Sequence, residues 1–526
     1  MRITQIDMQP NRIEGDSRFK KMAKNARVSL FFLVLVLVAT FVSRAVFIHK
    51  IGASFIGLAT TIVNIVGFLN LAEMGFASVV AFALYGPIHN RNRAEISAII
   101  TVFAYIYRRV GFVVMIVGIV GGIFIPHFFR SSGFSTGTIV STYYIYLFAT
   151  IIGYFFNYRE ILLVADQKNY VKVSIFNSLK LAKLGAQVVA VLYLDRKIFW
   201  WLGLELVSLV AYAYLLNAKI SQVYPWLDVD VRSGKNLSRD YLIIYKKSKQ
   251  AFVHKLAAVA LQQTGPIFVF VFLNLQVVTK YTNYTIIITA LTSVIAALFD
   301  STNAGVGNLV AARNSKRTLG VYWELQVSRF WLAGVAAYTL FSTVDLFIGA
   351  WVGEAYVLPK PVITVLAVGF FITVVRKTTD EFISASGLYH DTAAPLAEAA
   401  INISVTMVLG KMYGVFGIAM GSVISLLIIV GLWKPIFLHN EALGGNVRIY
   451  FVKTGGFLLI LIFSAFLTTK IGVLRFESQR MLDFVSVSIQ RCAVFGTISL
   501  FLFFILCVDM RILGRRFRRH VSLKRG

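Results

Sequence analysis

Two lysines three residues apart interrupt an apolar stretch and suit the binding of an anion. Lys180 and Lys183 fall near the centre of a helix expected over 171–194, and their spacing places them on one helix face. A charge at mid-bilayer costs at least about 2.5–3.5 kcal/mol, and two like charges on one face repel each other. Either a hydrated cavity accepts an anion there, or each lysine pairs with an acid such as Glu73 or Glu205. We favour the cavity.

Four further charged residues inside apolar segments are candidates for the same site or for ion coupling. Arg44 lies near the outer end of the first apolar segment. Arg376 lies in the inner half of 361–386, and a guanidinium suits bidentate contact with phosphate, although an acid four positions later also offers local pairing. Glu73 and Asp300 are the candidate proton or cation sites, or else packing partners for a basic residue.

Enzyme motifs are absent, apart from one weak exception. Asp228 and Asp230 form a DxD triplet, which in a glycosyltransferase holds a divalent cation inside a nucleotide-binding domain. About 30 loop residues cannot form such a domain, so we interpret the triplet as a solvated turn. The 7 histidines and 2 cysteines show no metal-ligand spacing, and no Walker motif occurs. We therefore expect no enzyme activity, no bound metal and no cofactor.

The composition is that of a membrane protein, with 58% hydrophobic and 14% charged residues and a mean hydropathy of +0.74. Soluble domains carry about 25% charged residues. The net charge of +28, from 52 Lys and Arg against 24 Asp and Glu, does not indicate a nucleic-acid partner, because no soluble basic domain is present to bind one.

Fourteen apolar segments are long enough to cross a bilayer, for which about 20 residues are needed. They are 27–48, 55–85, 99–126, 139–164, 171–194, 198–218, 250–273, 283–310, 328–352, 361–386, 392–413, 415–438, 450–470 and 482–508. With a cytoplasmic N-terminus, 38 of the 52 basic residues fall on inside loops, 12 fall outside, and Lys180 and Lys183 remain. The positive-inside rule therefore predicts that both termini are cytoplasmic, where anionic membrane lipids also favour basic residues.

The longest polar stretch divides the chain into six segments before it and eight after it, which predicts two helical lobes joined by a linker. Small-residue sequences in 75–87 and 303–311 hint at a repeat, as in transporters built from two repeats with a site between them. The predicted parts are a cytoplasmic segment 1–26, an N-lobe 27–218, a linker 219–249, a C-lobe 250–438, two further helices in 450–508 and a basic cytoplasmic tail 509–526.

The segment SRAVFIHKIGASFIGLATTIVNIVGFLNLAEMGFASVVAFALYGPI, residues 43–88, resembles the opening signature of Wzx-type polysaccharide flippases. These belong to the multidrug/oligosaccharidyl-lipid/polysaccharide exporter superfamily. The segments YTNYTIII (281–288), GNLVA (307–311), FIGAWVGEAYVL (347–358) and FISASGLYHDTAAPLAEAAINISVTMVLGKMYGVFGIAMGSVIS (382–425) match the family in the same order. The resemblance covers about residues 27–440.

The resemblance implies an all-α polytopic membrane protein with about 14 transmembrane helices, in which two six-helix lobes surround a central cavity and two C-terminal helices are appended. It implies translocation of undecaprenyl-pyrophosphate-linked oligosaccharide repeat units across the bacterial inner membrane for O-antigen or capsule synthesis. By position, Arg44, Lys180, Lys183 and Arg376 are the candidate cavity cations. Residues 262–269, QQTGPIFV, lack the acid that relatives often carry there, so Glu73 or Asp300 would have to provide any H+ or Na+ coupling.

Two other functions remain open. A drug or cation antiporter of the same superfamily would need buried carboxylates, and the two mid-span lysines argue against it. A membrane polysaccharide polymerase is less favoured, because no long external loop could carry its chemistry. A flippase would work alongside the polymerase and the glycosyltransferases of the same pathway.

Overall fold

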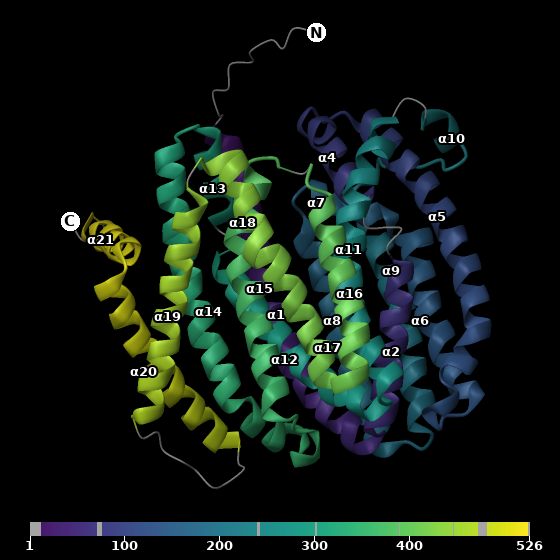
Figure 1. Ribbon diagram of the computed structural model, residues 1–526. Coiled ribbons are helices and arrows are strands. Elements are labelled where there is room, and N and C mark those ends of the chain that lie inside the picture. Colours follow the sequence, from purple (N-terminus) through teal and green to yellow (C-terminus); the bar gives the residue numbers. More distant parts are fainter. Residues whose placement is uncertain are drawn as a thin grey trace. The chain divides into compact units, whose positions relative to one another are not determined.

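The structure of the chain is a computed structural model that describes residues 12–70, 76–238, 242–299, 302–388, 390–444, 446–471 and 481–523. All regular elements in these ranges are helices, and none is a strand. The chain is therefore an all-α polytopic membrane protein, as predicted. It forms two compact units, Met1–Leu256 and Ala257–Gly526, which are described separately below (Figure 1).

Unit 1 contains the long N-terminal helix and the helices that follow it. They are α1 Arg12–Lys50, α2 Ala53–Leu69, α4 Phe76–His89, α5 Arg93–Phe128, α6 Thr136–Phe156, α7 Glu160–Ala165, α8 Asn169–Tyr193, α9 Lys197–Val223 and α10 Gly234–Leu237. Helix α11, Leu242–Phe272, begins in unit 1 and ends in unit 2. The predicted lobe boundaries stay predictions, because one helix runs across the division.

Unit 2 contains the remaining helices. They are α12 Leu275–Phe299, α13 Thr302–Ala311, α14 Ser315–Val352, α15 Lys360–Ala385, α16 Ala393–Tyr413, α17 Val415–Ser425, α18 Lys434–Leu438, α19 Val447–Lys470, α20 Met481–Leu506 and α21 Val508–Leu523. A π-helical stretch, Leu426–Trp433, connects α17 to α18, and a second one, His439–Leu443, follows α18.

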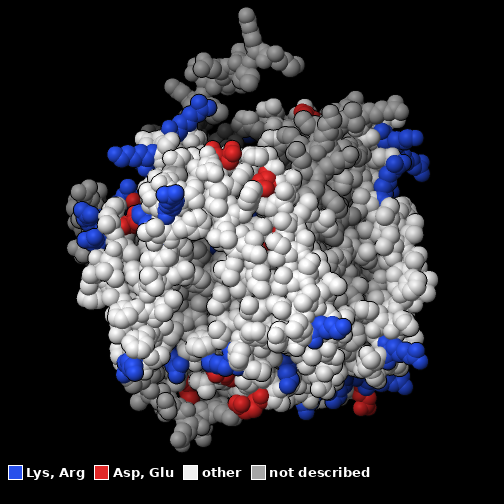
Figure 2. Space-filling model, in the orientation of Figure 1, with Lys and Arg blue, Asp and Glu red and all other residues white. Residues whose placement is uncertain are grey.

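Twelve helical segments are long and apolar enough to cross a membrane, within the described part of the chain. The structure does not describe the other two predicted segments in full. The segment predicted over 55–85 contains residues 71–75, between α2 and α4, and Val259–Phe272 is the described apolar part of the longer helix α11. Figure 2 shows the matching charge pattern: Lys and Arg side chains gather toward the helix ends, and the visible middle of the helices is uncharged.

Large apolar side chains cover the outer faces of the long helices. Phe31 and Val38 of α1 and Val113 and Ile123 of α5 are exposed. An apolar face of this extent is stable in lipid, because its side chains find the same environment there as in a protein core. The exposed faces agree with the membrane location that the composition predicts.

The turn that leads from α4 to α5 recurs in unit 2 between α13 and α14. Arg91 has a φ of 54° and is followed by Asn92, whose side chain caps α5 by accepting a hydrogen bond from a backbone N–H. Arg313 has the same φ of 54°, and Asn314 caps α14 in the same way. A left-handed backbone is uncommon outside glycine, so the same exception at both turns supports the predicted repeat.

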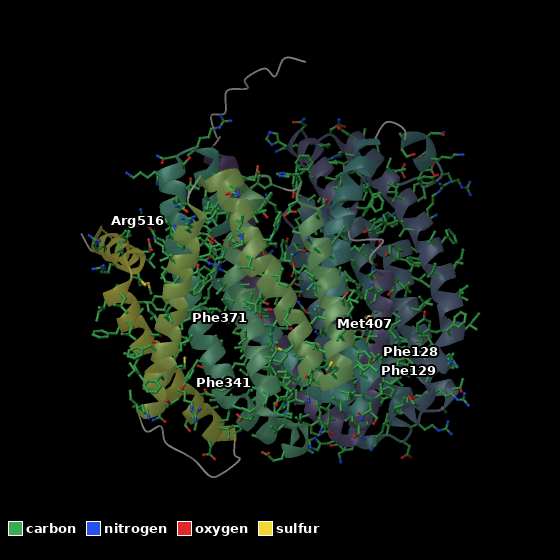
Figure 3. All side chains as sticks on the ribbon, viewed as in Figure 1. Phe128, Phe129, Phe341, Phe371, Met407 and Arg516 are labelled. Carbon is green, nitrogen blue, oxygen red and sulfur yellow. The ribbon has the colours of Figure 1, made fainter. Side chains whose placement is uncertain are left out.

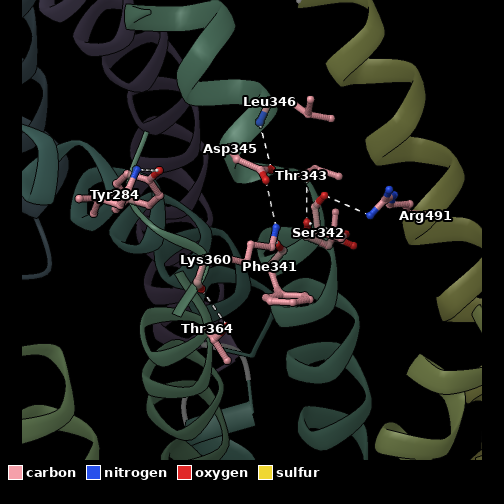
Figure 4. A network of polar contacts seen from close by, with 11 residues as sticks. Tyr284, Phe341, Ser342, Thr343, Asp345, Leu346, Lys360, Thr364 and Arg491 are labelled. Atoms are coloured by element: carbon pink, nitrogen blue, oxygen red, sulfur yellow. Dashed lines mark hydrogen bonds and ion pairs between the residues drawn. The ribbon is translucent and has the colours of Figure 1, made fainter. Parts of the chain in front are cut away.

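The last three helices of unit 2 pack around α14. Helix α20 contacts α14, and the Trp331 indole N–H donates to Ser499 Oγ at 3.2 Å. Nearer the other end of α14, Arg491 donates to the carbonyl of Ser342 at 3.1 Å (Figure 4). Helix α21 contacts both α14 and α20, and Arg516 pairs with Glu324 of α14 at 2.9 Å (Figure 3). These contacts attach the appended helices to unit 2.

Candidate functional site

Helix α8 positions the two lysines that the sequence singles out. It is a regular helix of 25 residues, so Lys180 and Lys183 lie near its middle and on one face, as predicted. Helices α1 and α9 both pack along α8. The surroundings of the two lysines are therefore set by three helices of unit 1.

Lys183 forms an ion pair with an acid of α9. Its ammonium lies 2.7 Å from Glu205 Oε1, and both side chains are largely buried. Gln187, one turn further along α8, donates to the other oxygen of Glu205 at 3.3 Å and to the carbonyl of Trp201 at 2.9 Å. For Lys183, the paired alternative therefore holds rather than the free cation.

Lys180 has different surroundings. It is half-buried and makes no hydrogen bond or ion pair with any residue in the described ranges. At 1.5 Å per residue, it lies about 16 Å from the first residue of α8, which is about half the thickness of the hydrocarbon core. An unpaired ammonium at this depth is stable only where water or an anion reaches it.

Arg44 lies on α1, further along the same pair of helices. The side chain of Asn25 joins α1 to the beginning of α8, because it donates to the carbonyl of Gln167 and accepts from the N–H of Tyr170. Counted from this contact at 1.5 Å per residue, Arg44 is about 13 Å further along the helix pair than Lys180. Arg44 therefore belongs to the predicted outer end of unit 1 and not to the level of the two lysines.

Arg376 belongs to an ion-pair network in unit 2. Its guanidinium pairs with Asp380, four residues later, at 2.9 Å and with Glu398 of α16 at 3.1 Å. Asp380 also pairs with Lys434 of α18 at 2.6 Å. The local pairing predicted for Arg376 is confirmed, and the network of two cations and two carboxylates has no net charge.

Arg329 is a buried charge at the start of the predicted segment 328–352 that the sequence pattern did not single out. It lies in α14 with 1% of its surface exposed, it donates to Glu381 of α15 and to Thr378, and its guanidinium covers the ring of Phe299 at 4.5 Å. Arg329 and Glu381 line a cavity of about 470 Å³ together with Lys377. Glu381 lies within the predicted segment 361–386, and an acid inside an apolar segment is a signal in the sequence for a buried cation such as Arg329.

Glu73 and Asp300, the predicted coupling residues, lie outside the described residues. No group of three His, Cys, Asp or Glu residues that could hold a metal ion occurs within the described ranges. The DxD triplet is part of a turn, because the Asp230 carboxylate accepts hydrogen bonds from the N–H groups of Arg232 and Ser233 at 3.0 and 3.3 Å.

No family model matches this sequence, and no curated protein matches it. Solved structures do match. Lipid II flippase MurJ in its inward closed conformation superposes with a TM-score of 0.64 at 11% identity, covering 89% of this chain and 98% of the flippase. An inward-facing multidrug resistance MATE family transporter of the MOP superfamily gives 0.58 at 15% identity, covering 79% and 98% of the two chains.

A MATE structure in complex with MaL6 gives a TM-score of 0.52 at 13% identity, covering 80% of this chain and 97% of the other. Identities this low establish a shared fold and leave the substrate open. The chain thus has the fold shared by MATE transporters and the lipid II flippase MurJ.

Proposed function

We propose that this chain is a flippase that moves undecaprenyl-pyrophosphate-linked oligosaccharide repeat units across the bacterial inner membrane by alternating access. The observation that carries the proposal is Lys180, a cation near the middle of a membrane helix that pairs with no described residue. The shared fold supports it, because one protein with that fold is named as a flippase of a lipid-linked substrate.

The charge balance around Lys180 favours an anionic substrate. Glu205, the acid of the neighbouring ion pair, is already neutralised by Lys183, so Lys180 adds one positive charge to this part of unit 1. A pyrophosphate that reaches Lys180 gains an opposite charge in a low-dielectric region, where the attraction is stronger than in water. This attraction offsets part of the cost of moving the head group off the leaflet surface.

The antiporter alternative requires a carboxylate that is free to bind a cation. Glu205, Asp380, Glu381 and Glu398 each form an ion pair with a lysine or an arginine. A lipophilic cation would have to displace these partners, which makes the four carboxylates poor cation sites in this conformation. The MATE structures nevertheless share the fold, so the test includes a cationic drug.

The test is transport in vesicles that contain only the purified protein. A fluorescent undecaprenyl-pyrophosphate oligosaccharide should become accessible on the far leaflet with the wild-type chain, and Lys180→Gln should abolish that movement. Lys180→Arg keeps the charge and should retain transport, while Lys219→Gln, an exposed lysine at the end of α9, is the matched control.

Ethidium movement without saccharide movement would replace the proposal by the antiporter. Longer glycan chains made from supplied repeat units would identify a polymerase instead. H+ or Na+ coupling through Glu73 or Asp300, cytoplasmic termini, and cooperation with the polymerase and glycosyltransferases of the pathway are parts of the same proposal. An imposed H+ or Na+ gradient in the same vesicles tests the coupling.

A further inference from the structure

Unit 1 contains a cavity of about 780 Å³ where α4, α7 and α9 end and α5 begins. Its innermost wall is apolar and consists of the buried residues Ile96, Leu162 and Ala165. The volume is within the range of about 300–1,000 Å³ that is usual for small-molecule sites. On the topology predicted from the basic residues, the cavity faces the cytoplasm.

Basic side chains outnumber acidic ones in the lining of this cavity. Arg91, Arg93 and Lys168 line it together with a single acid, Asp166. Lys168 already neutralises Asp166, since the ammonium lies 2.7 Å from the carboxylate. Arg91 and Arg93 form no ion pair with any residue that the structure describes, so two guanidinium groups remain available to an anion.

Aromatic side chains form the other wall. Tyr85, Tyr224 and Trp226 line the cavity, and the Arg93 guanidinium lies 5.5 Å from the centre of the Trp226 ring. Burial, together with the neighbouring Asp166 carboxylate, raises the pKa of Tyr224 above its usual range. The hydroxyl therefore stays protonated and donates to Asp166 at 2.9 Å. Asp166 is thus satisfied by Lys168 and Tyr224, and it does not compete with an incoming anion for Arg91 and Arg93.

The repeat provides an internal comparison for the arginine-bearing turn. Arg313 occupies the same left-handed position in unit 2 as Arg91 does in unit 1, followed by the same Asn cap. Arg313 does not line the unit 2 cavity that contains Arg329. The turn thus recurs in both units, and in unit 1 it lies beside an aromatic and basic cavity.

We propose that this cavity binds the phosphate groups of a lipid head group at the cytoplasmic surface. Arg91 and Arg93 contact the phosphate oxygens through their planar N–H donors, which suit bidentate phosphate contact. Tyr85 and Trp226 pack against the group that is attached to the phosphate, either a sugar or the rest of a phospholipid head group. Two lipids offer this chemistry: the lipid-linked saccharide, in which case the inference rests on the proposed function, and an anionic phospholipid, which basic pockets of membrane proteins also bind.

The position along α8 makes the cavity a loading site distinct from Lys180. Lys168, at the cavity, immediately precedes α8, and Lys180 lies twelve residues further along the chain. The two are therefore separated by about 18 Å at 1.5 Å per residue. A head group held by Arg91 and Arg93 would be at the membrane surface, one step before it reaches the mid-span cation.

The experiment measures lipid binding to the purified full-length chain by native mass spectrometry. The probes are undecaprenyl pyrophosphate, phosphatidylglycerol and phosphatidylcholine. The variant Arg91→Gln with Arg93→Gln should weaken binding of undecaprenyl pyrophosphate by about 10-fold for each arginine removed, because each loses a charge-assisted hydrogen bond. The matched control, Arg313→Gln with Arg317→Gln, should bind within about two-fold of wild type.

If phosphatidylglycerol binds as well as undecaprenyl pyrophosphate does, and if its binding is also lost in the Arg91 and Arg93 variant, the occupant is a bulk phospholipid. Selective loss of undecaprenyl pyrophosphate identifies the lipid-linked substrate. Unchanged binding in the Arg91 and Arg93 variant, or an equal loss in the control, overturns the inference, provided that thermal unfolding of both variants matches wild type.

The two proposals fail separately. Binding that depends on Arg91 and Arg93 without saccharide transport in vesicles removes the proposed function and keeps this site. Transport that depends on Lys180 with unaltered binding in the arginine variant removes this site alone.

Discussion

Removing one member of the Lys183–Glu205 pair should destabilise the chain more than removing both. The charges are 2.7 Å apart, and the side chains of Lys183 and Glu205 are 17% and 12% exposed. Loss of one partner leaves the other charge buried, at a cost of about 3–5 kcal/mol, whereas an apolar pair of similar volume is often neutral. Gln187 still contacts Glu205 when the lysine is absent, so Lys183→Met should cost about 3 kcal/mol.

Glu205→Leu should cost about 5 kcal/mol, because it leaves Lys183 without its acid on the helix face that also carries Lys180. The double variant Lys183→Met with Glu205→Leu should lose less than about 1 kcal/mol. Denaturation of the purified protein in mixed micelles, followed by circular dichroism, measures the free energies of unfolding. The exposed control Lys219→Met should change that free energy by no more than about 0.5 kcal/mol.

A double variant whose loss equals the sum of the two single losses would refute the reasoning, because the two charges would then be energetically independent. The same variants also separate structure from transport. If Lys183 acts only through its pair, the double variant folds and still moves the lipid-linked saccharide, while Lys180→Gln folds and does not.

Two further predictions concern unit 2. Gly417→Ala should lower the free energy of unfolding by about 1–3 kcal/mol, because a Cβ there would lie 1.9 Å from a backbone carbonyl oxygen of α16. Gly431→Ala is the control and should leave the free energy of unfolding unchanged, because no atom lies closer than 3.9 Å to its Cβ. Equal thermal midpoints for the two variants would contradict this prediction. Burial, with smaller electrostatic effects, raises the pKa of the Cys507 thiol to about 11 from 9.0. In a Cys492→Ser background its alkylation near about pH 8 should therefore be about 100-fold slower in the native than in the unfolded chain, and the gap should close as the pH rises through 11.

The sequence predicts the helical membrane fold well, because one property decides it. A segment such as 30–42 is apolar on every face, and only a helix satisfies its backbone in lipid. Helix lengths are less predictable: α5 and α14 begin at Arg93 and Ser315, earlier than the apolar segments do. Their first turns are polar, so hydropathy misses them, although Asn92 followed by Glu95 is a recognisable helix start.

The sequence predicts contacts within one helix of the candidate site, but it does not predict which residues of neighbouring helices pair with each other. Spacing along one helix places Lys180 and Lys183 together and pairs Arg376 with Asp380. The choice of Glu205 as the partner of Lys183 depends on how α8 and α9 rotate against each other, which hydropathy does not encode. Arg329 was not singled out for the same kind of reason, because its burial depends on how α14 and α15 pack against each other.

The neutral network of unit 2 has a mechanical consequence. Arg376, Asp380, Glu398 and Lys434 join α15, α16 and α18 through three ion pairs. Sliding any one of these helices past the others would expose a bare charge to an apolar medium, at a cost comparable to much of a domain's stability. The three helices are therefore stiff against shear. They should move as one rigid body, so that any bending is concentrated in segments outside the network.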